Sequence, residues 1–153
     1  DVALRERLEA LRREVLAVPR EREAVARAVC EMRARMRSEL TAQKDNATRF
    51  DLKRDPGGIV DIEFVVQFLV LAHADEFPSL TKWSDVIRLL EALGQEHLIS
   101  PADASALSEA YLAYRGAIHV LTLEGLEPRV SDAAYSPQRE QVRRVAESLL
   151  PGL

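Results

Sequence analysis

The feature of this sequence that most restricts its fold is an apolar run that follows a break in the chain. Segment 55–58, Asp-Pro-Gly-Gly, cannot extend a helix, because proline fixes its own φ and glycine is conformationally free. The residues from Ile59 onward are then apolar on nearly every side, and such a helix is typically buried. Asp61, Glu63 and Gln67 interrupt the run too early for a membrane span. We therefore expect a buried central helix that begins near Ile59.

The composition indicates one all-helical domain. A chain of 153 residues suits a single domain with a real core. Apolar residues make up 47% and charged residues 30%, with only 6 glycines and 5% aromatic residues. The formal net charge of −4 argues against a general nucleic-acid binder.

Helical periodicity and Pro or Gly stops divide the chain into helices. We predict an all-α bundle of about five or six helices around the central one. The other expected helices are Val2–Val18, Arg20–Leu40, Val86–Leu93, Pro101–Leu123 and Gln138–Leu150, with loops at Thr41–Arg49 and Gly125–Ala134.

Particular residues are expected to start these helices. Ser100 before Pro101 is an N-cap with proline at the first helical position, and Ser136 before Pro137 repeats the pattern. For the helix that begins near residue 86, Thr81 and Ser84 are the candidate N-caps.

The Gly-Gly break is also a candidate binding site. A helix N-terminus offers free backbone N–H groups and a positive dipole end, both of which suit anions. Lys53 stands a few residues upstream, Gly57 and Gly58 form the turn, with Gly58 expected at positive φ, and Asp61 and Glu63 fall near the first turn. One interpretation is a phosphate or nucleotide contact at these five residues. The other is a plain turn whose two carboxylates compensate the helix dipole.

Metal and thiol chemistry find little support in the sequence. Asp61 and Glu63 are two residues apart, so on a helix they diverge by roughly 200° and cannot form a metal pair. There is no Asp-x-Asp sequence and the histidines lack ligand spacing, so no metal site is expected. Cys30 is the only cysteine, which excludes an intramolecular disulfide. No catalytic cluster of serine, histidine and aspartate can be assembled either.

Targeting signals are also missing from the sequence. We find no signal peptide, membrane span or lipidation motif, so no membrane partner and a cytoplasmic location are expected. The chain begins without methionine, as a fragment of a larger multidomain enzyme would.

The run of residues 53–67 resembles the signature of glutamine-synthetase adenylyltransferases. The matching elements are Lys53, then Gly57-Gly58-Ile59, then Asp61-Ile62-Glu63-Phe64. Further similarity lies in segments 80–91 and 110–115 and at Val130-Ser131.

The resemblance implies a fold and a function. Enzymes of that family attach AMP to glutamine synthetase and remove it, using two nucleotidyltransferase halves that are each followed by a helical domain. The chain resembles the helical domain after the second, adenylylating half. The implied partners are the preceding nucleotidyltransferase domain, glutamine synthetase and a PII-type nitrogen signal protein, and the implied cofactors are ATP and magnesium.

Within that family, Lys53, Gly57, Gly58, Asp61 and Glu63 would lie near the nucleotide. The family's catalytic unit holds magnesium on an Asp-x-Asp pair, which this sequence lacks. We therefore expect the chain alone to bind no cofactor and to be inactive. The alternative is a regulatory module that binds a nitrogen-signal protein or glutamine synthetase without touching nucleotide.

Overall fold

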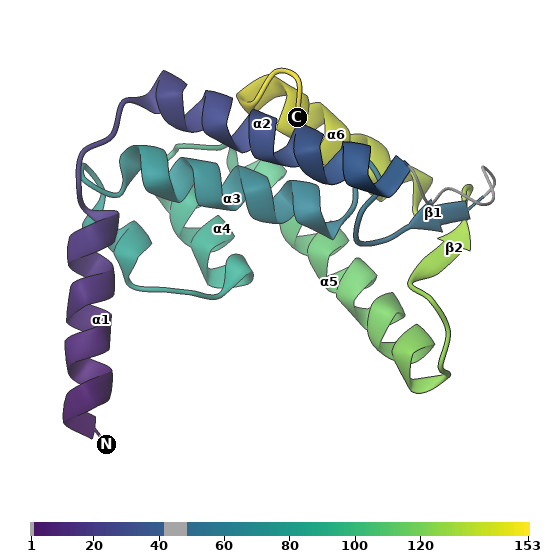
Figure 1. Cartoon of the computed structure of the whole chain (residues 1–153), viewed down its shortest axis with the longest axis horizontal. Helices are drawn as coiled ribbons and strands as arrows, with labels where there is room; N and C mark the ends of the chain where they lie inside the picture. The colour runs from purple at the N-terminus through teal and green to yellow at the C-terminus, as the bar shows by residue number, and fades with distance from the viewer. Residues whose placement is uncertain (1, 42–48) are drawn as a thin grey trace.

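The structure is a computed structural model that describes residues 2–41 and 49–153, and most of these residues are helical (Figure 1). The predicted all-α bundle is confirmed. The helices of these residues are α1 (Val2–Leu16), α2 (Arg22–Thr41), α3 (Ile59–His73), α4 (Val86–Gln95), α5 (Pro101–Leu123) and α6 (Ser136–Leu149), with a short 3-10 helix η1 (Pro78–Thr81) and strands β1 (Arg49–Asp51) and β2 (Arg129–Ser131). The expected loop at Thr41–Arg49 lies almost wholly at 42–48, outside the described residues.

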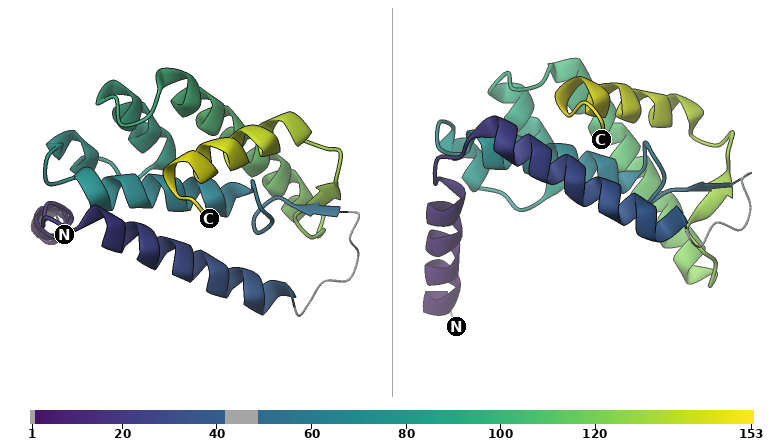
Figure 2. Two further views of the ribbon diagram at one scale, coloured as in Figure 1. Left: turned by 90° about the horizontal axis from the view of Figure 1, so that it is seen from above. Right: turned by 45° about the horizontal axis from the view of Figure 1, so that its top comes forward.

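The helix α3 forms the centre of the bundle, as predicted. It contacts α2, α4, α5 and α6, which surround it (Figures 1 and 2). Its buried side chains are Ile59, Asp61, Ile62, Val65, Val66, Phe68, Leu69, Val70 and Ala72. Although α3 is apolar on most sides, neither it nor another helix in the described ranges is long and apolar enough to cross a bilayer.

The first helix, α1, stands apart from this bundle. It projects at a steep angle from the start of α2 (Figures 1 and 2), and none of its residues is buried. Its attachment is polar: Arg12 donates to the carbonyl oxygen of Thr81 at 2.7 Å, and Arg20 donates to the last carbonyl groups of α1. The helix was predicted correctly, but its apolar residues contribute nothing to the core.

A two-stranded antiparallel hairpin closes the far end of the bundle. Strand β1 pairs with β2, placing Phe50 opposite Val130, so the prediction of a plain loop over Gly125–Ala134 is wrong. Three-residue strands are too short to show a period of two, and the partners are far apart in sequence. Phe50 is fully buried and packs edge-on against Tyr114 at 5.9 Å between ring centroids.

The helix starts follow capping chemistry. The Ser100 side chain accepts a hydrogen bond from the Asp103 amide, as the sequence predicted. At α4 the cap is Asp85, whose carboxylate accepts from the Arg88 amide, so neither Thr81 nor Ser84 has this role. Thr81 is instead the last residue of η1, where its hydroxyl donates to the carbonyl of Pro78.

Candidate functional site

The turn that leads into α3 satisfies its own amide groups. The amide of Gly57 donates to Asp61 Oδ2 at 2.7 Å, and that of Gly58 donates to the carbonyl of Asp55 at 2.9 Å. The amide of Ile59 donates to the carbonyl of Leu52 at 2.9 Å. Because these donors are taken, the expectation that the amides of Gly57 and Gly58 would bind a phosphate is wrong.

The two glycines are required for close packing. Gly57, not Gly58 as expected, has positive φ, at +85°, whereas Gly58 is extended with φ −86° and ψ −173°. A Cβ atom at Gly58 would lie 2.8 Å from the carbonyl oxygen of Leu52, and one at Gly57 would lie 2.7 Å from that of Arg139. The turn is therefore a tightly packed joint between α3 and α6.

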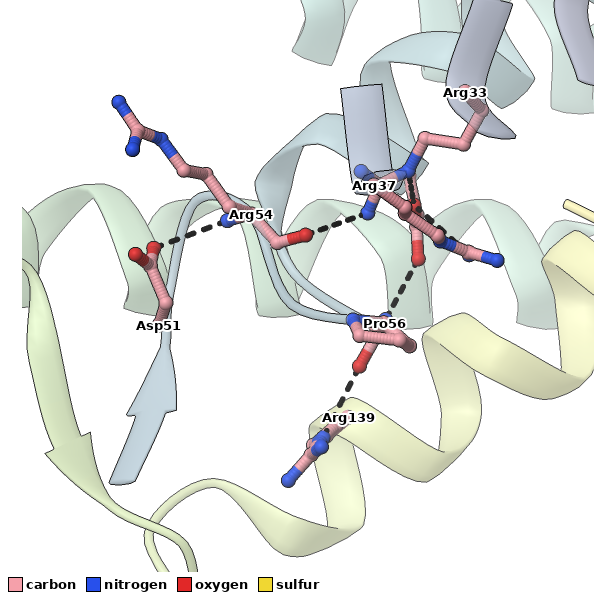
Figure 3. A network of polar contacts seen from close by, with 8 residues as sticks. Arg33, Arg37, Asp51, Arg54, Pro56 and Arg139 are labelled. Atoms are coloured by element: carbon pink, nitrogen blue, oxygen red, sulfur yellow. Dashed lines mark hydrogen bonds and ion pairs between the residues drawn. The ribbon is translucent and has the colours of Figure 1, made fainter. Parts of the chain in front are cut away.

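Asp61 is the buried anchor of this joint. Its side chain is 3% exposed and accepts a hydrogen bond from Nε of Arg33 on α2 at 2.6 Å, and Arg33 is itself fully buried. Arg33 also donates to the carbonyl of Arg54 at 2.8 Å (Figure 3). The expectation that Asp61 lies beside a nucleotide fails for a physical reason, since both its oxygens are used to tie α2 and the turn to α3.

Asp61 and Glu63 point to different sides of α3, as their spacing on a helix predicted. Asp61 meets Arg33 of α2, whereas Glu63 lines a cavity against α5 with Arg115. No group of three metal-ligating side chains occurs within residues 2–41 and 49–153. This separation leaves Glu63 and Lys53 as the predicted site residues that share an open surface.

That surface is a cavity of about 580 Å³ between the start of α3 and the second half of α5, here called the α3–α5 pocket. Its wall combines charged and apolar groups. The polar or titratable residues are Lys53, Glu63, Arg115, His119 and Thr122, and the others are Ile59, Val60, Tyr111 and Ile118.

The charges of the α3–α5 pocket favour an anionic ligand. The exposed Lys53 ammonium pairs with neither Asp51 nor Asp55: those carboxylates accept from backbone amides instead. Arg115 lies over the ring of Tyr111, with its guanidinium carbon 5.7 Å from the centroid. Burial raises the pKa of Glu63, and the nearby Arg115 opposes that shift. Two cations, one carboxylate and an apolar wall suit a ligand with both anionic and apolar parts.

The contribution of α5 to this pocket was missed. Tyr111, Arg115 and His119 recur at four-residue spacing and so share one helix face, which was a visible signal. Nothing in that spacing shows that the face meets Lys53, because the contact depends on how α5 crosses α3.

The comparison with known families corrects the assignment made from the motif. A family model described as GlnD PII-uridylyltransferase matches residues 23–149, from the start of α2 to the end of α6. The assignment to glutamine-synthetase adenylyltransferases is therefore wrong, and with it AMP transfer to glutamine synthetase and that enzyme as a partner. The physical reason is that Gly57, Gly58 and Asp61 serve the packing of the turn, which carries no information on the transferred nucleotide. The match covers most of the chain, which therefore belongs to the GlnD PII-uridylyltransferase family.

Proposed function

We propose that the chain is the helical domain of a multidomain enzyme that transfers a uridylyl group to a PII protein. In this proposal the α3–α5 pocket faces the nucleotide held by a neighbouring nucleotidyltransferase domain. The observation that carries the proposal is the pairing of two cations, Lys53 and Arg115, on an apolar wall beside the N-terminus of α3.

The proposal assigns separate roles to the residues of the motif. Lys53 and Arg115 contact phosphate oxygens, to which cationic donors bind strongly. Gly57, Gly58 and Asp61 act at one remove, because they fix the turn that carries Lys53. Glu63 limits the positive charge of the pocket and helps to hold Arg115 in place.

The cofactors in this proposal are UTP and magnesium, with UTP in place of the ATP expected from the motif. The described side chains gather no three metal ligands, so we assign the metal to the nucleotidyltransferase domain. A metal ion there would neutralise phosphate charge during transfer. The helical domain contributes binding and orientation of the nucleotide.

The test uses the full-length enzyme with Lys53→Ala or Arg115→Ala, measuring UMP transfer from UTP to a PII protein. We expect kcat/KM to fall at least tenfold in each variant, which corresponds to about 1.4 kcal/mol of lost transition-state binding. The melting temperature should change little, because the Lys53 ammonium has no hydrogen-bond or ion-pair partner in the described parts of the chain.

The matched control is Arg54→Ala. Arg54 neighbours Lys53 and is exposed, and its guanidinium points away from the polar network (Figure 3). It should keep the parent rate. Transfer within twofold of the parent in both Lys53→Ala and Arg115→Ala would refute a nucleotide role for this pocket.

The second candidate is a domain that docks the PII protein without touching nucleotide. Its support is the outer face of α5, where Leu112, Val120 and Leu123 are each more than half exposed. Replacing Leu112 and Val120 by serine in the full-length enzyme separates the two candidates. A raised KM for PII with an unchanged KM for UTP would favour docking at α5.

A further inference from the structure

A second cavity lies on the opposite side of the turn, between α2, the turn and the end of α6. Its volume is about 230 Å³. We call it the arginine pocket, since Arg37 of α2 and Arg143 of α6 line it together with Pro56, Asp61 and Glu147. It shares no lining residue with the α3–α5 pocket.

The arginine pocket holds more cations than its carboxylates can compensate. Asp61 is committed to Arg33 at 2.6 Å and to the Gly57 amide at 2.7 Å, and Arg37 approaches it only to 3.9 Å. Arg143 has no hydrogen bond or ion pair in residues 2–41 and 49–153. Glu147 is the one other acidic side chain on the wall, so three arginines face two carboxylates.

The gathering of these guanidinium groups is unfavourable without a further anion. Burial and the positive charges of Arg33 and Arg143 lower the pKa of Arg37, while Asp61 opposes this shift. Nη1 of the fully buried Arg33 has no hydrogen-bond partner within the described chain. Like charges that are packed together and partly desolvated destabilise a fold unless an opposite charge is added.

We propose that the arginine pocket binds a phosphate-sized oxyanion between Arg37 and Arg143. A guanidinium group presents parallel N–H donors that match two phosphate oxygens, and two such groups can hold one tetrahedral anion. The cavity has room for a compact ion or for one phosphate group at the end of a larger molecule. Because this pocket lies on the other side of α3, the assignment is independent of the function proposed for the α3–α5 pocket.

The experiment measures binding of inorganic phosphate to the full chain by calorimetry, at constant ionic strength maintained with chloride. The parent should bind phosphate in preference to chloride, and Arg143→Gln should weaken this binding at least fivefold. Arg143→Lys should recover part of the affinity, because it restores the charge without the paired donors. Arg143 is exposed, so these variants are expected to fold.

Arg54→Gln is the matched control, since it removes one exposed arginine charge outside the pocket. It should leave the affinity within twofold of the parent. Uridine monophosphate serves as a second ligand: binding that depends on Arg143 supports a terminal phosphate group, and failure to bind beside bound phosphate supports a free ion. The proposal is overturned if the parent does not prefer phosphate to chloride, or if Arg143→Gln and Arg54→Gln bind phosphate equally well.

Discussion

At the scale of single residues, the ion pair between Arg33 and Asp61 determines how α2 meets the centre of the bundle. Both side chains are almost inaccessible to water. A pair like this adds little stability compared with a well-packed apolar pair, but the loss of one member leaves the other charge buried alone. Its consequence is that α2 and the turn before α3 are held in one relative position.

We predict that Arg33→Met and Asp61→Asn each lower the free energy of unfolding by about 3–5 kcal/mol, because each leaves a buried charge without its partner. The measurement is urea denaturation followed by circular dichroism. The double variant Arg33→Met with Asp61→Leu should recover part of the loss, since no buried charge remains. Arg35→Met is the control on the exposed side of α2 and should change the stability by less than about 0.5 kcal/mol. Equal losses in Arg33→Met and Arg35→Met would contradict this reading of the pair.

At the scale of elements, the turn before α3 differs from the helices in how it uses glycine. Gly57 and Gly58 are buried and have atoms of other segments where a side chain would begin. Gly116 lies within α5, where a Cβ atom would meet nothing within 4 Å. The same residue type therefore has opposite effects on stability in the two elements.

We predict that Gly57→Ala and Gly58→Ala each destabilise the chain by about 1–3 kcal/mol, through backbone strain at the first and close contact at both. Gly116→Ala should stabilise it by about 0.5–1 kcal/mol, because alanine loses less conformational freedom in a helix. Thermal melts of the three variants test both signs. A Gly58→Ala variant as stable as the parent would show that the Leu52 carbonyl can move aside.

At the scale of the whole molecule, the chain consists of a bundle and an attached helix. The bundle contains α2 to α6, which is also the range matched by the family model. The helix α1 makes its contacts through η1 and buries no side chain. The cooperative unit of folding should therefore begin near α2.

We predict that deletion of residues 1–19 changes the melting temperature by only a few degrees, because α1 is held by partly exposed hydrogen bonds worth about 1 kcal/mol each. Deletion of α6, a helix of similar length, should abolish cooperative melting, since Val142, Val145 and Ala146 belong to the core. Differential scanning calorimetry of the two truncated chains makes the comparison. The two-part description fails if loss of α1 alone removes the transition.

The sequence alone was enough to predict the helices, the buried centre at α3 and the cap at Ser100. These features depend on residues within a few positions of one another, so periodicity and capping chemistry reveal them. Only the tertiary structure decided that Asp61 faces Arg33, that Phe50 pairs with Val130, and that Lys53 shares a pocket with Arg115. These contacts join segments far apart in the chain, so they are fixed by the crossing of whole helices. The motif at residues 53–67 was misread for the same reason: its conformational demands are local, whereas the function of its side chains depends on what packs against them.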